Sequence, residues 1–153
     1  MSVVNDLRDQ INARRIIFDN ATPGQAARLR RELLGENAGT KVIPRLQSLV
    51  LEVSRLQPIR ISSIIRSGSS RRHVVGRAFD VGNESIAGAL LPQIATDARV
   101  AELRIDELIF DARVAGQSNR NRWNYDNGRR HSSDSATLTQ HNNHIHFAVM
   151  AED

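Results

Sequence analysis

The chain has 153 residues, of which 40% are hydrophobic, and a formal net charge of +4. This length suits one folded domain with its own core, so we expect residues 1–153 to form a single domain. The absence of cysteine excludes disulfide bonds and thiolate metal ligands.

The positive charge comes almost entirely from arginine, because Lys41 is the only lysine. The arginines are interspersed with 17 acidic residues, and no helix-turn-helix, RNA-binding or zinc-finger pattern occurs. We therefore expect a basic surface without a nucleic-acid partner. No apolar run reaches the length of a membrane span, and Met1–Gln10 lacks the apolar core of a secretory signal. These features predict synthesis in the cytoplasm without a signal peptide.

The first third of the sequence has a helical pattern. Apolar spacing predicts helices over 4–17, 24–35 and 44–56, and the third is the clearest amphipathic segment. Pro58 then separates a helical N-terminal part, residues 1–57, from the remainder of the chain.

Residues 58–150 have the pattern of a sheet. A helical segment over 84–102 is expected to break near Asp97, and the polar segment 115–140 is expected to form a long loop over the metal site described next. Short alternating or β-branched segments predict strands over 59–66, 77–81, 105–111 and 144–149. The predicted fold is α+β, with N-terminal helices packed on a small, mostly antiparallel sheet that carries the site.

Two short clusters, residues 73–80 and 141–146, hold four of the five histidines. With one aspartate they offer the nitrogen and oxygen ligands of a catalytic zinc ion, which needs three protein ligands, an open position and a nearby base. Isolated histidines are more often surface groups or hydrogen-bonded core groups, but two clusters that both suit strands favour a metal site. The candidate group is His73, Asp80, His141, His144 and His146.

The spacing within each cluster predicts which side chains meet. Residues i and i+2 of a strand share a face, so His144 and His146 point together. Ala78 shares a face with Asp80 and is small enough to leave room for a metal ion. Gly76 permits a tight turn or a close backbone approach, which would bring the histidine three residues earlier back over Asp80.

These residues resemble the shared pattern of the zinc peptidase superfamily that joins D-Ala-D-Ala carboxypeptidases, lysostaphin-type enzymes and hedgehog signalling domains. The pattern is His-x6-Asp followed by His-x-His, and the form His-x-x-Gly-x-Ala-x-Asp is typical of the carboxypeptidase branch. The resemblance implies one zinc ion per chain, held by His73, Asp80 and His146, with His144 beside the metal as a catalytic group.

The spacing of His141 before the last two histidines is also similar to that of penicillin-insensitive murein endopeptidases, which implies that His141 belongs to the active site. The resemblance covers roughly residues 58–149. The chain departs from the pattern at Arg71, where the branch often has serine, and it lacks the catalytic glutamate that dipeptidases of the branch carry before the last ligand.

Four further residues are candidates for the site. Arg66 ends a predicted strand, where the family often has an arginine that holds a substrate carboxylate or carbonyl; the alternative is a solvated basic loop. Trp123 is the only tryptophan and Tyr125 the only tyrosine; they either form a wall for substrate or cover the edge of the core. Asp111, which shares a strand face with Glu107, either acts as an acid/base group or a partner that orients a ligand imidazole, or is a strand-end salt-bridge partner.

The residues together predict a zinc-dependent hydrolase, and the resemblance specifies a metallopeptidase that cuts stem or cross-link peptides of bacterial peptidoglycan. Without a signal peptide, such an enzyme would reach the cell wall through a lysis or injection apparatus, as a phage endolysin or a component of a phage-like particle does. The alternative is a binding or structural module of such a particle that contains zinc but has no catalytic activity.

Overall fold

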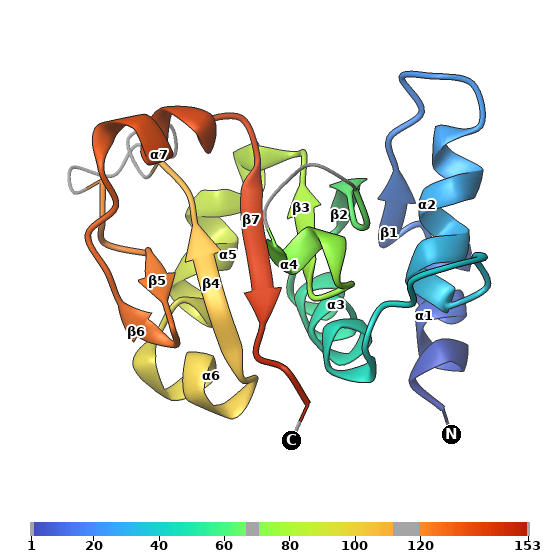
Figure 1. Ribbon diagram of the computed structural model, residues 1–153, viewed down its shortest axis with the longest axis horizontal. Coiled ribbons are helices and arrows are strands. Elements are labelled where there is room, and N and C mark those ends of the chain that lie inside the picture. The colour runs from blue at the N-terminus through green and yellow to red at the C-terminus, as the bar shows by residue number, and fades with distance from the viewer. Residues whose placement is uncertain (1, 67–70, 112–119, 153) are drawn as a thin grey trace.

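The computed structural model describes residues 2–66, 71–111 and 120–152. The centre of this part of the chain is a seven-stranded sheet with the order β1-β2-β3-β7-β4-β5-β6 (Figure 1). β1 and β2 are parallel, whereas all other neighbouring strands are antiparallel. The strands are β1 (Ile16–Phe18), β2 (Ile59–Ser63), β3 (Ala78–Val81), β4 (Ile105–Ile109), β5 (Tyr125–Asp126), β6 (Arg129–Arg130) and β7 (Ile145–Val149). The predicted α+β class with a mostly antiparallel sheet is confirmed.

The helices of the N-terminal part lie beside and behind the sheet (Figure 1). Ser2 caps the first helix by accepting a hydrogen bond from the N–H of Asn5 at 3.1 Å, and Gly35, with φ of 74°, ends the second. The helices are α1 (Val3–Asn12), α2 (Gln25–Leu34) and α3 (Pro44–Leu56). The third packs against α1, β7 and the later helix α5 (Ala87–Ile94). Among the described residues, no helix combines the length and apolarity needed to cross a membrane.

The prediction of one helix over 4–17 is wrong at its C-terminal end. The helix stops at Asn12, and Arg14 adopts φ of 59°, a left-handed conformation that a helix does not continue through. Ile16–Phe18 then form a strand that pairs with β2. Their β-branched and aromatic side chains suit a strand, but three residues are too few to show a period of two in the sequence.

The segments after β3 are more broken than the sequence pattern. The predicted helix over 84–102 divides into a 3-10 turn (Glu84–Ile86), α5 and α6 (Asp97–Glu102), and Thr96 caps the last of these. The break therefore lies beside Asp97, as predicted. The described part of the expected loop 115–140 is not a loop throughout, because it contains the β5–β6 hairpin and α7 (Ser135–Gln140); residues 115–119 lie outside the described residues.

The core positions the site through the pairing of β3 with β7. Phe79 pairs with Phe147, and their rings stack with centroids 5.1 Å apart on the face that packs into the core. Ile145 and Val149 lie on the same face and are fully buried. The opposite face of these two strands is therefore held rigidly by a packed apolar layer.

Candidate metal centre

β3 and β7 bring the first two members of the site together. Asp80 lies directly opposite His146 in the antiparallel ladder, and both side chains are buried. Nδ1 of His146 is 3.0 Å from Oδ1 of Asp80. Ala78 and Ala148, the next pair along the same face, are small and leave the space beside them to these larger groups.

The third member, His73, comes from the four-residue helix α4 (Arg71–Val74) and is folded back by Gly76. Gly76 has φ of 74°, and a Cβ atom there would lie 2.4 Å from the carbonyl oxygen of Lys41. The N–H of Ile43 donates to the carbonyl oxygen of Gly76 at 3.1 Å, which fixes the turn. Only glycine meets both requirements, so the predicted turn over Asp80 is confirmed.

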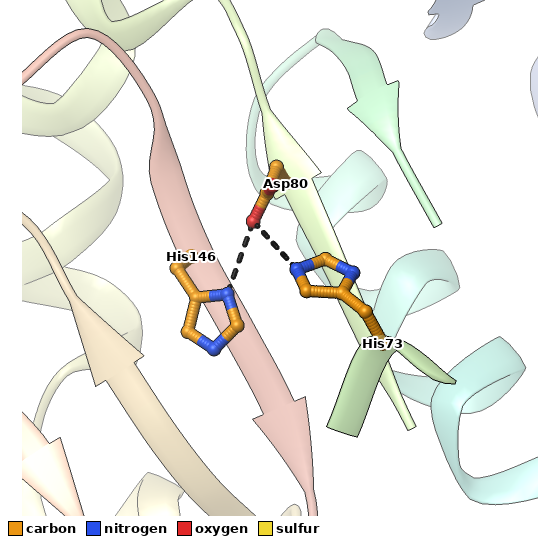
Figure 2. Close-up of side chains that lie close together, drawn as sticks. All are labelled: His73, Asp80 and His146. Atoms are coloured by element: carbon orange, nitrogen blue, oxygen red, sulfur yellow. Dashed lines mark hydrogen bonds and ion pairs between the residues drawn. The ribbon is translucent and has the colours of Figure 1, made fainter. Parts of the chain in front are cut away.

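His73 is fully buried and presents one ring nitrogen to Asp80 (Figure 2). Its Nδ1 is 2.7 Å from the carbonyl oxygen of Ile64, which can only accept, so Nδ1 carries the proton. In the neutral ring Nε2 is then an acceptor; it lies 3.4 Å from Oδ1 of Asp80 and has no hydrogen-bond partner. A buried nitrogen lone pair without a partner calls for an explanation, and a metal ion is one.

Ligand atoms of His73, Asp80 and His146 all lie within 4.8 Å of one another. The group can therefore hold a metal ion with two imidazole nitrogens and one carboxylate oxygen. Three protein ligands leave further coordination positions open. The three residues come from three different elements, α4, β3 and β7, and meet at one point on the face of the sheet opposite the stacked phenylalanines.

The charges of the group stabilise one another. Burial disfavours the charged form of Asp80, but the hydrogen bond from His146 and the closeness of both His146 and His73 outweigh burial and hold the pKa of Asp80 well below its usual range. Burial likewise disfavours protonated His146, but Asp80 and Glu107 outweigh it and raise the pKa of His146 to about 9. A metal ion that binds at this group must therefore displace a proton from His146 at neutral pH.

The remaining two histidines of the clusters also lie at the group. The His141 ring centroid is 5.1 Å from that of His144 and 5.6 Å from that of His146. Nε2 of His144 lies 4.0 Å from Oδ2 of Asp80. Burial lowers the pKa of both His141 and His144, so both rings are neutral at pH 7. The structure thus brings all four clustered histidines to one place.

Arg66 lies at the exposed edge of the group. Its guanidinium is 3.5 Å from Oδ2 of Asp80, and 45% of its side chain is exposed to solvent. The strand predicted over 59–66 ends at Ser63, so Arg66 extends from the segment that follows β2. This position leaves most of its donors free to meet a molecule that approaches Asp80 from solvent.

Trp123 and Tyr125 are both buried in the core, and Tyr125 also lines a cavity that borders Glu107. They are 7% and 1% exposed, and the hydroxyl of Tyr125 donates to Oδ1 of Asp97 at 2.8 Å. Their polar neighbours in the sequence concealed this burial. Asp111 forms an ion pair with Arg120 at 3.2 Å, the salt-bridge alternative for this residue. Its N–H also donates to the carbonyl oxygen of His141 and so helps to hold that segment in place.

Glu107 is the residue of the site to which the sequence assigned no role. Its Oε1 lies 3.0 Å from Nε2 of His146, and Arg72 lies 3.6 Å from its other oxygen. Burial disfavours its charge, but the hydrogen bond and attraction from His146 lower its pKa nevertheless. The alternation of β4 places Glu107 and Ile109 on one face, but only the register of β4 with β7, in which Ile109 lies opposite His146, shows that this face carries the site.

A cavity of about 280 Å³ adjoins the centre on the side of Glu107. Polar groups line it, among them Asp126 of β5 and, from the segment between β6 and α7, His131, Ser133 and Asp134. It lies between β4 and the segment before α7, so this described part of the predicted loop borders the centre at Glu107.

Comparison of the chain with protein-family models, with curated proteins and with solved structures finds no match in any of the three. The function therefore has to be inferred from the centre itself.

Proposed function

We propose that the protein is a zinc-dependent metallopeptidase that hydrolyses peptide bonds in the stem or cross-link peptides of bacterial peptidoglycan. The observation that carries the proposal is the convergence of a three-ligand group, two neutral histidines and an exposed arginine at one place. A site that only stabilises a fold has no need of the last three groups, because structural zinc sites are closed by four protein ligands.

The donor set supports zinc as the metal. Two imidazole nitrogens and one carboxylate oxygen are the ligands of several catalytic zinc sites. The unpartnered Nε2 of buried His73 and the adjacent Nδ1 of His146 fit a borderline-soft divalent ion. A bound zinc ion supplies a water of lowered pKa and polarises the carbonyl that is attacked.

His144 is the residue best placed to move protons. Its Nδ1 donates to the side-chain oxygen of Asn143 at 2.8 Å, which leaves Nε2 as an acceptor beside Asp80. His141 has the same tautomer, with the proton on Nδ1, because its Nδ1 donates to the carbonyl oxygen of Thr137 at 2.6 Å. Nε2 of His144 accepts the proton of the attacking water and returns it to the leaving amine, and His141 supports this transfer.

Arg66 is placed to bind the substrate. A planar guanidinium donates two parallel hydrogen bonds to a carboxylate, or one to a peptide carbonyl. Both groups occur in peptidoglycan peptides. The peptidoglycan part of the proposal depends on the resemblance of the two histidine clusters to the zinc peptidase superfamily.

The proposal is tested by incubating the zinc-loaded protein with purified peptidoglycan and measuring the free amino groups released. We expect release by the wild type, a loss of about 100-fold or more in His144→Ala with zinc still bound, and no change in Glu52→Gln, which alters a glutamate that pairs with Arg99 on α3. A wild type that binds zinc but releases no amino groups would contradict the peptidase proposal and support the non-catalytic module instead.

A further inference from the structure

His146 is held from both sides by carboxylates. Nδ1 faces Oδ1 of Asp80 at 3.0 Å, and Nε2 faces Oε1 of Glu107 at 3.0 Å. The two ring nitrogens therefore have different surroundings. Nδ1 points into the group that contains His73, whereas Nε2 points away from it, toward β4.

Glu107 is itself fixed in place. Arg72 lies 3.6 Å from Oε2 of Glu107 and 3.1 Å from the carboxylate of Asp106, so its guanidinium bridges two neighbouring acids of β4. Arg72 directly precedes His73 in α4. The contacts therefore run from Arg72 of α4 to Glu107, on to His146 and Asp80, and from Asp80 back to His73 of α4.

We propose that Glu107 is a positioning residue of the metal centre, which selects the ring nitrogen through which His146 binds the metal. In the metal-free centre both ring nitrogens of His146 face carboxylates, which can only accept, so both carry a proton. Because Glu107 holds the proton on Nε2, a metal ion displaces the proton on Nδ1, and Nδ1 then presents its lone pair to the metal. Without Glu107, the proton can move to Nδ1, where Asp80 accepts it, and the lone pair then points away from the metal position. The inference depends on the metal-binding part of the proposed function, but not on peptidase activity.

The same geometry excludes other roles for Glu107. Both of its oxygens have partners, one on His146 and one on Arg72, so neither is free to take a proton from a substrate. Asp111, the carboxylate first considered for orienting an imidazole, is engaged by Arg120 instead. Outer carboxylates that orient a ligating imidazole change metal affinity when removed, which separates this role from a purely structural ion pair.

The test is the zinc affinity of the full chain, measured by competition with a chelator at pH 9 to limit competition from protons at His146. We expect Glu107→Gln, which keeps the shape but loses the charge, to weaken zinc binding about 10-fold, and Glu107→Ala by up to about 100-fold. The control is Glu52→Gln, which removes a glutamate that is paired with Arg99 at 2.7 Å on α3 and should bind zinc as the wild type does.

A second readout follows the proton directly. In the zinc-loaded wild type, NMR of ¹⁵N-labelled histidine should show a proton on Nε2 of His146 and zinc at Nδ1; in Glu107→Gln the Nε2–H signal should shift or exchange faster. Zinc affinity and an Nε2–H signal that are both unchanged in the folded Glu107→Gln variant would overturn the inference, as would a wild type that binds no zinc. Since no substrate is involved, an inactive but zinc-binding protein would contradict the peptidase proposal and leave this inference standing.

Discussion

The two faces of the β3–β7 ladder differ, although each is built by two of its four residue pairs. On one face, Phe79 pairs with Phe147 and Val81 with Ile145, and all four side chains are fully buried in the core. On the other face, Asp80 pairs with His146. One face gains stability from removing apolar surface from water, whereas the other removes charges from water and must satisfy them by mutual contacts.

The stability of the fold and the chemistry of the site are therefore separable along this ladder. The charged groups of the polar face tolerate burial because they have partners. In the described part of the centre, the one buried ring nitrogen without a hydrogen-bond partner is Nε2 of His73. Substitutions on the apolar face should destabilise the fold and so weaken metal binding as well. Substitutions on the polar face should weaken metal binding before they destabilise the fold.

The largest expected effect is on the apolar face. Phe147→Ala removes a fully buried ring that stacks on Phe79, so we expect the free energy of unfolding to fall by about 3–5 kcal/mol. Urea unfolding measures it. The matched control is Ile17→Ala on β1, where the side chain is 42% exposed and the expected loss is below about 1 kcal/mol. Equal losses in the two variants would refute the assignment of Phe147 to the core.

The next effect is a pH dependence of the polar face in zinc-free protein. The folded pKa of His146 is raised to about 9, above its ordinary value of 6.5, so its stabilisation is fully present below pH 6.5 and is lost as pH rises through 9. We expect the free energy of unfolding to fall on the order of 3 kcal/mol over this window. The pKa of His141 and of His144 is lowered, so their contribution is lost below pH 6.5, outside this window.

Urea unfolding in the presence of a chelator, at several pH values between 6.5 and 9, measures this dependence. His146→Ala is the control and should show a flatter profile. The same steep fall in the variant would show that another group titrates. Added zinc should stabilise the wild type more at pH 9 than at pH 6.5, because it then displaces fewer protons.

The smallest of these effects concerns the turn at Gly76, which returns His73 to Asp80. Gly76→Ala combines a positive φ with a backbone collision, so we expect a loss of about 2 kcal/mol or more together with weaker zinc binding. Gly39→Ala is the matched control, because Gly39 has φ of 86° but open space around it; it should cost about 1 kcal/mol and leave zinc affinity unchanged. Unchanged zinc affinity in Gly76→Ala would contradict the role of the turn.

Local patterns were sufficient to predict much of the centre. Strand alternation predicted that His144 and His146 lie on one side; β7 begins only at Ile145, but His144 directly before it still lies at the group, with Nε2 4.0 Å from Oδ2 of Asp80. Glycine at position 76 indicated the turn that returns His73 to Asp80. Both features depend on residues close together in the sequence. The amphipathic helix over 44–56 was predictable for the same reason.

The features that were missed depend on long-range pairing. Glu107 joins the centre only because β4 pairs with β7 in one register, and a shift of one residue would turn it to the other face. Trp123 and Tyr125 are buried although their sequence neighbours are polar, because the hairpin folds them against the core. β1 is held by β2, which lies about 40 residues later, and not by its own pattern.

The most direct test of the account is the zinc content of purified protein, measured by elemental analysis for the wild type, His146→Ala and His131→Ala. We predict one zinc ion per chain in the wild type and in His131→Ala, and none in a folded His146→Ala. A wild type without metal after zinc is added, or a His146→Ala that retains it, would contradict the assignment of His73, Asp80 and His146 as a zinc centre.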